Sequence, residues 1–262
     1  MLQAAEVTFR YHLGTPLVVD GVTLDVGRGD LVGILGPNGS GKTTLLRLLS
    51  GTRAPTSGRV LLDGQPLARL GRRDIARRLA VVPQETELAF EYSALEIVLM
   101  GRHPHLGLFE VEGPRDHAIA REALAATGTA HLESRLFHTL SGGEKQRVVI
   151  AAALAQAADV LLLDEPTASL DLGYQLDIAA LLARLNRDRG VTMVISTHDL
   201  NLAATLCRTL VLMRNGRVVA SGPTDTVLTP DHVRAIYDVD ADVHVHEGTG
   251  HVTVVPVRRL RP

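Results

Sequence analysis

The residues best suited to chemistry form one stretch that follows a short apolar run at 31–35. The stretch fits the pattern G-x-x-x-x-G-K-[S/T] without a mismatch and reads, in order, Gly36, Pro37, Asn38, Gly39, Ser40, Gly41, Lys42, Thr43 and Thr44. Glycines let the backbone turn tightly, so that its N–H groups and the start of the next helix cradle an anionic phosphate. Lys42 can then reach the β- and γ-phosphates, and the Thr43 hydroxyl can ligate Mg²⁺. Lys42 is also one of two lysines in a chain that otherwise uses arginine, which argues against a chance match.

Two adjacent carboxylates, Asp164 and Glu165, end a second apolar run at 160–163. A carboxylate at the end of a buried strand is costly unless it is hydrogen-bonded, paired or close to a metal. Asp164 is therefore a candidate to hold the same Mg²⁺ as Thr43, and Glu165 to orient and deprotonate an attacking water. The structural alternative is an acidic turn after a strand, and the phosphate-binding loop makes the catalytic interpretation the stronger one.

A second candidate anion site lies at Leu140-Ser141-Gly142-Gly143-Glu144. Ser141 is a natural N-cap, and the exposed N–H groups of Ser-Gly-Gly at a positive helix end favour an anion. On this motif alone, a plain capped helix start would be the better interpretation. Two phosphate-binding helix starts in one chain make sense if Ser141–Gly143 serves a nucleotide held by another copy. That arrangement predicts a head-to-tail dimer that closes over two ATP molecules.

The elements that would position these residues follow from hydrophobic periodicity. Alternation over residues 1–30 predicts antiparallel strands, and the continuous apolar runs at 31–35, 160–163 and 192–196 predict buried parallel strands. Helical spacing dominates residues 85–158, where strand-like runs stop. Asn215-Gly216 predicts a hairpin turn, and Thr229-Pro230 a helix start.

These patterns divide the chain into four segments. We expect a nucleotide-binding core with an antiparallel β subdomain at 1–84, a helical subdomain at 85–158, the second part of the core at 159–222 and a C-terminal extension at 223–262. The fold class is α/β. The net charge of −2 gives no sign of a nucleic-acid partner. No apolar run is long enough to span a bilayer, so if the protein works at a membrane, another chain does the spanning.

The sequence closely resembles the ATP-binding subunits of ABC transporters over residues 1–225. Six motifs in the family's order carry the resemblance: the phosphate loop, Gln84 after a strand, the signature at 140–144, the second nucleotide motif at 161–165, the D-loop at 169–171 and the switch histidine His198. The resemblance implies a P-loop NTPase core of RecA-like type with an N-terminal antiparallel β subdomain and an inserted helical subdomain. It also implies ATP hydrolysis coupled to transport, with ATP and Mg²⁺ as cofactors.

The resemblance also implies roles for single residues. Gln84 would reach Mg²⁺ and the water, His198 would contact the γ-phosphate, and Asp171 would cross the dimer interface. Tyr11 would stack on adenine; from the residues alone, its ring could equally be one more core aromatic. The signature departs from the commoner pattern at Glu144, where Gln is usual, and a carboxylate there would slightly weaken the positive field.

A softer resemblance, carried by 96–105, Phe109, Asp116 and the C-terminal extension, points to importers of iron chelates, haem or cobalamin. In that family the block after Gln84 meets a polytopic membrane permease, which in turn works with a substrate-binding protein. The protein would then lie on the cytoplasmic face of the cell membrane as a peripheral subunit. Within 85–110, apolar side chains that we expect to be exposed suit such docking: Leu88, Phe90, Tyr92, Leu106, Leu108 and Phe109. Ordinary packing within the helical insert is the alternative.

Other functions fit less well. A soluble ABC ATPase acting on DNA would carry a coiled coil between Gln84 and Leu140, where no sustained heptads occur, and ribosome-acting members usually carry two ATPase units. An exporter ATPase is disfavoured by the resemblance at 96–105. The pairs His103/His105 and His244/His246 each lack a third ligand nearby in the sequence, so we do not expect metal sites there.

Overall fold

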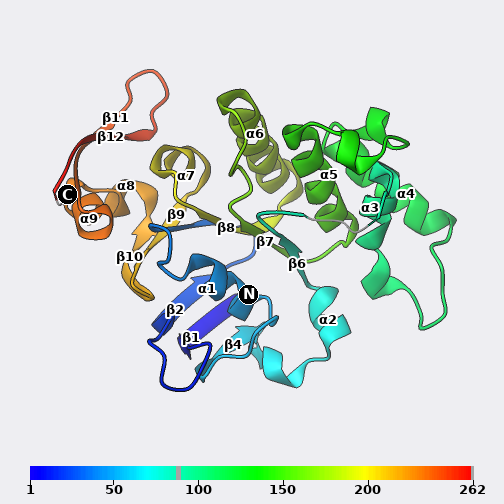
Figure 1. Cartoon of the computed structure of the whole chain (residues 1–262), viewed down its shortest axis with the longest axis horizontal. Coiled ribbons are helices and arrows are strands. Elements are labelled where there is room, and N and C mark those ends of the chain that lie inside the picture. The colour runs from blue at the N-terminus through cyan, green and yellow to red at the C-terminus, as the bar shows by residue number, and fades with distance from the viewer. Residues whose placement is uncertain (87–89, 261–262) are drawn as a thin grey trace. The chain divides into compact units, whose positions relative to one another are not determined.

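The computed structural model describes residues 1–86 and 90–260, which form two compact units (Figure 1). The first unit joins residues 1–70 with 186–262, and the second contains residues 71–185. The four segments expected from the sequence use other boundaries and stay a prediction.

The first unit contains the antiparallel sheet expected near the N-terminus. Its strand order is β2-β1-β4-β5, and its members are β1 (Leu2–Phe9), β2 (Val19–Val26), β4 (Ser57–Leu62) and β5 (Gln65–Pro66). Leu2 pairs with Val26 on one side and with Leu62 on the other, and all three are buried. One face of the sheet is thus apolar, which explains the alternation in the sequence.

The parallel core of the same unit has the order β10-β9-β3-β8. Its strands are β3 (Leu31–Leu35), β8 (Thr192–Thr197), β9 (Thr209–Arg214) and β10 (Arg217–Pro223), with helices α1 (Lys42–Leu49) and α7 (Leu200–Leu206) following β3 and β8. Every residue of β3 and β8 is buried, so both strands are continuously apolar or small. β10 pairs antiparallel with β9 across Asn215-Gly216, which confirms the predicted hairpin.

The C-terminal extension belongs to the first unit. It contains α8 (Thr224–Val227), α9 (Pro230–Tyr237), β11 (Val239–Val245) and β12 (Val252–Arg259). Thr229 caps α9 by accepting a hydrogen bond from the His232 N–H at 3.2 Å, as predicted. Strands β11 and β12 pair antiparallel as a hairpin, and Asn201 of α7 bonds both the N–H and the C=O of Val254.

The second unit combines two parallel strands with helices. β6 (Leu79–Val82) pairs in parallel with β7 (Val160–Asp164). The helices are α2 (Arg72–Ala76), α3 (Ala94–Met100), α4 (Pro114–Ala126), α5 (Gly142–Ala155) and α6 (Leu172–Arg189), the last of which ends in the first unit. The basic helix α2 is short, because the buried strand β6 begins at Leu79. In the part of the chain that the structure describes, no helix is long and apolar enough to cross a membrane.

Candidate nucleotide site

The phosphate loop joins β3 to α1, the strand–loop–helix arrangement that the sequence predicts. Lys42 begins the helix and is buried, with 5% of its surface exposed. Its Nζ donates hydrogen bonds to the carbonyl oxygens of Gly36 at 2.8 Å and Pro37 at 3.2 Å. The ammonium therefore lies over the inside of the loop, where an anionic phosphate would meet it together with the helix N-terminus.

Two glycines of the loop are required by close backbone contacts. A Cβ at Gly36 would lie 2.3 Å from the Met213 carbonyl oxygen, and one at Gly41 would lie 2.5 Å from that of Val18. Gly41 also has a φ of 102°, a region that other residues rarely adopt. The loop is thus held tightly against neighbouring backbone on its outer side.

The hairpin turn of β9–β10 supports this loop, a role that sequence analysis missed. The Gly216 N–H donates to the Ser40 carbonyl oxygen at 3.0 Å, and a Cβ at Gly216 would lie 2.7 Å from Val18 O. Asn-Gly signalled only a tight turn, because no local pattern reveals what a turn packs against. The Ser40 hydroxyl is buried and has no hydrogen-bond partner among the described residues. An orphaned polar atom inside a glycine cradle fits a loop that receives a polar ligand.

Tyr11 and His198 also belong to the first unit. The Tyr11 hydroxyl lies 3.1 Å from the Thr44 hydroxyl in the first turn of α1, and its ring meets Phe9 edge-on with centroids 5.0 Å apart. Tyr11 as a whole is 43% exposed, so it borders the phosphate loop and stays accessible. His198 is exposed and follows β8 directly, while Asp199 caps α7 through the Asn201 and Leu202 N–H groups.

The second unit holds the acidic residues. Asp164 ends β7 and Glu165 follows it, and both are buried, with 8% and 9% of their surface exposed. Glu165 has a φ of 45°, a strained value for a residue with a side chain, and such strain persists where the surroundings hold it, often at functional sites. Gln84 is exposed and lies two residues beyond β6, the strand paired with β7.

The signature forms a capping box at the start of α5. The Ser141 hydroxyl accepts from the Glu144 N–H at 3.3 Å, and the Glu144 carboxylate accepts from the Ser141 N–H at 2.8 Å. This backbone hydrogen bond, with smaller contributions from the Ser141 hydroxyl and Arg135, holds the pKa of Glu144 below its ordinary value. The residue that departs from the commoner signature is therefore engaged within its own helix start.

The D-loop packs against the signature. A Cβ at Gly143 would lie 2.2 Å from the Tyr174 ring, and one at Gly142 would lie 3.3 Å from Leu170. Asp171 caps α6, since its Oδ1 accepts from the Tyr174 N–H at 3.0 Å. The structure therefore brings 141–144 and 169–174 together within the second unit, a contact that the sequence did not indicate.

One member of each histidine pair contacts the backbone. Within residues 1–86 and 90–260, no group of three His, Cys, Asp or Glu side chains is placed to hold a metal ion. His105 is engaged elsewhere, with Nε2 2.8 Å from the Gln156 carbonyl oxygen, and the His246 Nδ1 accepts from the Gly248 N–H at 3.2 Å.

Comparison with known proteins identifies the family. The family profile described as "ABC transporter" matches residues 19–168. The cobalamin import ATP-binding protein BtuD of Halobacterium salinarum is 44% identical over 92% of this chain and 60% of that protein. The hemin import ATP-binding protein HmuV of Gloeobacter violaceus is 44% identical over 98% of this chain and 94% of that protein. The chain thus spans about 60% of the length of the first relative and nearly all of the second.

Solved structures agree on the fold. A chain of a transporter assigned to the metal-chelate type, in an inward-facing conformation, superposes with a TM-score of 0.86 at 30% identity, covering 98% of this chain and 97% of that one. A dimeric ATP-binding cassette in a post-hydrolysis state with ADP and Pi gives a TM-score of 0.74 at 29% identity, covering 86% and 99%. The predicted P-loop NTPase fold with an antiparallel β subdomain and helical segments is confirmed. The chain belongs to the ATP-binding proteins of the ABC transporter family.

Proposed function

We propose that this protein is the ATP-hydrolysing motor subunit of an importer for an iron chelate, haem or cobalamin. The observation that carries the proposal is the phosphate loop, in which buried Lys42 lies over the loop carbonyls at the start of α1. The cargo class rests on relatives named for cobalamin and hemin import, which are 44% identical over most of this chain.

ATP is held by the loop at 36–44 in this proposal. Lys42 neutralises the β- and γ-phosphates, and the amide groups at the start of α1 bind phosphate oxygens. Tyr11 offers its exposed ring to the adenine, since its hydroxyl is already fixed to Thr44.

Catalysis needs a metal and an activated water. Oxygen ligands suit Mg²⁺, so Thr43, Asp164 and Gln84 would hold it, and the ion would neutralise charge that develops on the phosphates. Glu165 orients and deprotonates the attacking water, and His198 contacts the γ-phosphate. The position of Asp164 and Glu165 at the end of β7 supports these roles, as does the strained backbone of Glu165 with its φ of 45°.

A second copy completes each site. Ser141, Gly142, Gly143 and Glu144 start α5 of one copy and would meet the γ-phosphate bound by the other, while Asp171 reaches across the interface. The dimeric cassette with ADP and Pi supports this arrangement by similarity. ATP binding would favour the closed dimer, and hydrolysis would reopen it, which moves the attached permease.

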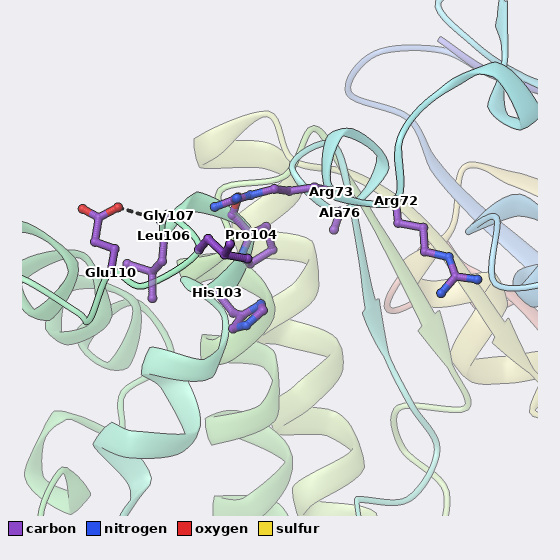
Figure 2. Close-up of a pocket in the computed structure, with 9 residues that line it drawn as sticks. Arg72, Arg73, Ala76, His103, Pro104, Leu106, Gly107 and Glu110 are labelled. Carbon is purple, nitrogen blue, oxygen red and sulfur yellow. Dashed lines mark hydrogen bonds between the residues drawn. The ribbon is translucent and has the colours of Figure 1, made fainter.

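The permease docks on the second unit in this proposal. A pocket of about 420 Å³ lies between α2 and the residues that follow α3 (Figure 2). It is lined by Arg72, Arg73, Ala76, His103, Pro104, Leu106, Gly107, Leu108 and Glu110. Leu108 of the lining and its neighbour Phe109 are 87% and 95% exposed, and this combination of a pocket with an apolar rim suits a partner helix.

The docking residues expected from the sequence are only partly exposed. Phe90, Leu108 and Phe109 are exposed, as predicted, and Tyr92 is half-buried. Leu106 is buried, contrary to the prediction, because an irregular stretch has no periodicity that separates inward from outward residues. Leu88 lies outside the described residues.

Purification from its native membrane tests this function. A tagged chain should bring down a polytopic permease, and the reconstituted complex should hydrolyse ATP faster when a loaded substrate-binding protein is added. A peripheral subunit on the cytoplasmic face should leave the membrane at high salt or high pH without detergent. Recovery of ribosomes or DNA in place of a permease would overturn the transport function.

A further inference from the structure

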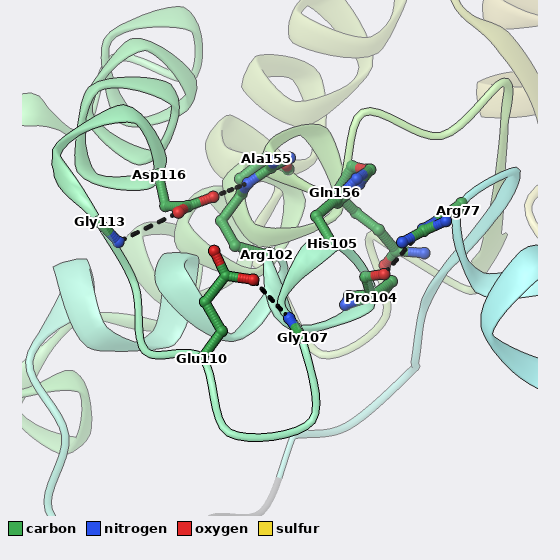
Figure 3. A network of polar contacts seen from close by, with 10 residues as sticks. All are labelled: Arg77, Arg102, Pro104, His105, Gly107, Glu110, Gly113, Asp116, Ala155 and Gln156. Atoms are coloured by element: carbon green, nitrogen blue, oxygen red, sulfur yellow. Dashed lines mark hydrogen bonds and ion pairs between the residues drawn. The ribbon is translucent and has the colours of Figure 1, made fainter.

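The carboxyl end of α5 is held by the turn that follows α3 (Figure 3). Arg102 Nη1 donates to the Ala155 carbonyl oxygen at 2.7 Å, and His105 Nε2 lies 2.8 Å from that of Gln156. A carbonyl can only accept, so the His105 Nε2 carries the proton. The last carbonyls of a helix have no partner within the helix, and these two side chains supply what α5 lacks.

The same turn is fixed on its other side by α2. Arg73 Nε and Arg77 Nε both donate to the Pro104 carbonyl oxygen, at 2.8 and 2.9 Å. Buried Arg102 is also held by an ion pair with half-buried Asp116 at 2.9 Å. Residues 102–105 therefore join the end of α5 to α2 through polar contacts of fixed geometry.

Gln156 closes this arrangement into a ring. Its side-chain Nε2 donates to the carbonyl oxygen of Ala76, the last residue of α2. It also donates, at 3.0 Å, to the carbonyl oxygen of Leu79, the first residue of β6. Its own carbonyl accepts from His105. One residue thus contacts the turn at 103–105, the end of α2 and the strand that leads to Gln84.

The pocket in Figure 2 is formed by two segments that these hydrogen bonds connect. One wall is α2, with Arg73 and Ala76, and the other runs from His103 to Glu110. Both walls are fastened to the carboxyl end of α5, and α5 begins at the Ser141 cap. α5 is one continuous helix from Gly142 to Ala155, so it connects the fastened carboxyl end to the Ser141 cap.

We propose that Gln156 and His105 are positioning residues that fasten the pocket to the carboxyl end of α5. They let a permease segment seated in the pocket set the position of Ser141 and, through β6, of Gln84. The proposal rests on the permease docking described above. It predicts that the two residues matter for permease-stimulated hydrolysis and not for hydrolysis by the ATPase subunits alone.

The first test compares Gln156→Met with Gln146→Met in the reconstituted complex. Methionine keeps the length of glutamine and removes the amide donor. Gln146 lies on the same helix, and its Nε2 has no hydrogen-bond partner among the described residues, so its replacement is a matched control. Gln156→Met should lower stimulated ATP hydrolysis by roughly 2- to 30-fold, the range for residues of a coupling network. Hydrolysis by the isolated ATPase subunit and its ATP affinity should stay near wild type.

The second test uses His105. His105→Ala should lower the stimulated rate in the same way, whereas His105→Gln should restore much of it, because a glutamine Nε2 can donate to the Gln156 carbonyl. Equal stimulation in wild type, His105→Ala and Gln156→Met would overturn the positioning role. An equal loss in the isolated subunit would do so too, since it would mean general destabilisation. If wild type itself shows no stimulation by the permease, the proposed function fails as well.

Discussion

Helices α1 and α5 both begin at a glycine-rich turn, but only α5 has side chains that cap its N-terminal amide groups. Gly41 precedes α1 and has no side chain with which to cap it, and the first turn carries no acidic residue. Ser141 and Glu144 cap α5 reciprocally, and the Glu144 carboxylate sits on the Ser141 N–H at 2.8 Å. The start of α1 thus presents the Lys42 ammonium, whereas the start of α5 is occupied by the Glu144 carboxylate of the same chain.

This difference indicates different tasks. The start of α1 gathers a buried ammonium and uncapped backbone, so we expect it to bind nucleotide in the single chain. The start of α5 already satisfies part of its positive field with Glu144, so we expect it to bind phosphate poorly alone. It would contribute when another copy presents a nucleotide that is already bound. The three predictions below test that division, from the largest expected effect to the smallest.

Glu165→Gln should slow hydrolysis by about 10²- to 10⁴-fold, the contribution of a positioned general base. Glutamine keeps the shape and cannot accept the proton, so ATP binding should persist. With hydrolysis blocked, the start of α1 in one copy and the start of α5 in the other should remain bound to the same ATP. Light scattering should then show that ATP shifts the protein from monomer to dimer. Glu247→Gln, in an exposed turn of the C-terminal hairpin, is the control. Unchanged turnover in Glu165→Gln would sink the base assignment.

Lys42→Ala and Ser141→Arg should separate the two helix starts. Lys42→Ala removes the ammonium and should weaken ATP binding by the single chain roughly 10- to 150-fold, the range for a hydrogen bond to a charged group. Ser141→Arg should leave that affinity within about twofold and yet lower hydrolysis at dimer-forming concentrations by about 10²-fold, as for loss of one electrostatic stabiliser. Fluorescent ATP titration and a phosphate-release assay measure the two quantities.

Ser141→Ala is the matched control, because it removes the cap without adding bulk or charge. It should cost about 0.5–2 kcal/mol of helix stability and far less activity than Ser141→Arg. Loss of ATP binding by the single chain in Ser141→Arg would contradict action on a second copy's nucleotide. In that case both helix starts of one chain would bind the nucleotide held by that same chain.

Most residues of the candidate site could be proposed from the sequence, because the phosphate loop and the segment at 161–165 are continuous stretches with tight local geometry. The N-cap roles of Ser141 and Thr229 were predicted for the same reason, since a cap depends on neighbours three residues away. The contact of Gly216 with Ser40 and that of Gly143 with Tyr174 were not, because each joins residues that are distant in the chain.

The turn at 102–105 shows the limit most clearly. The sequence presented two histidines that could have been a metal pair and an apolar run that could have been a surface. In the structure, His105 contacts the Gln156 carbonyl oxygen, and Leu106 is buried in the lining of the pocket. Neither outcome follows from periodicity, because the stretch has none and its partners come from α2 and α5.

Glu144→Gln should give the smallest effect, and it tests the capped start of α5 directly. Glutamine at this position keeps the reciprocal cap but carries no charge, so at neutral pH the variant should be less stable by about 0.3–1 kcal/mol, the usual worth of a carboxylate at a helix N-terminus. The folded pKa of Glu144 lies below its ordinary value of 4.5. Its contribution is therefore present above pH 4.5 and is lost as the pH falls through the folded pKa. Urea unfolding of both proteins at pH 7 and between pH 5 and 3 should show the difference shrinking only in the acid range. Identical stabilities at pH 7 would mean that the carboxylate does not satisfy the positive end of α5, and the contrast with α1 would then rest on Lys42 alone.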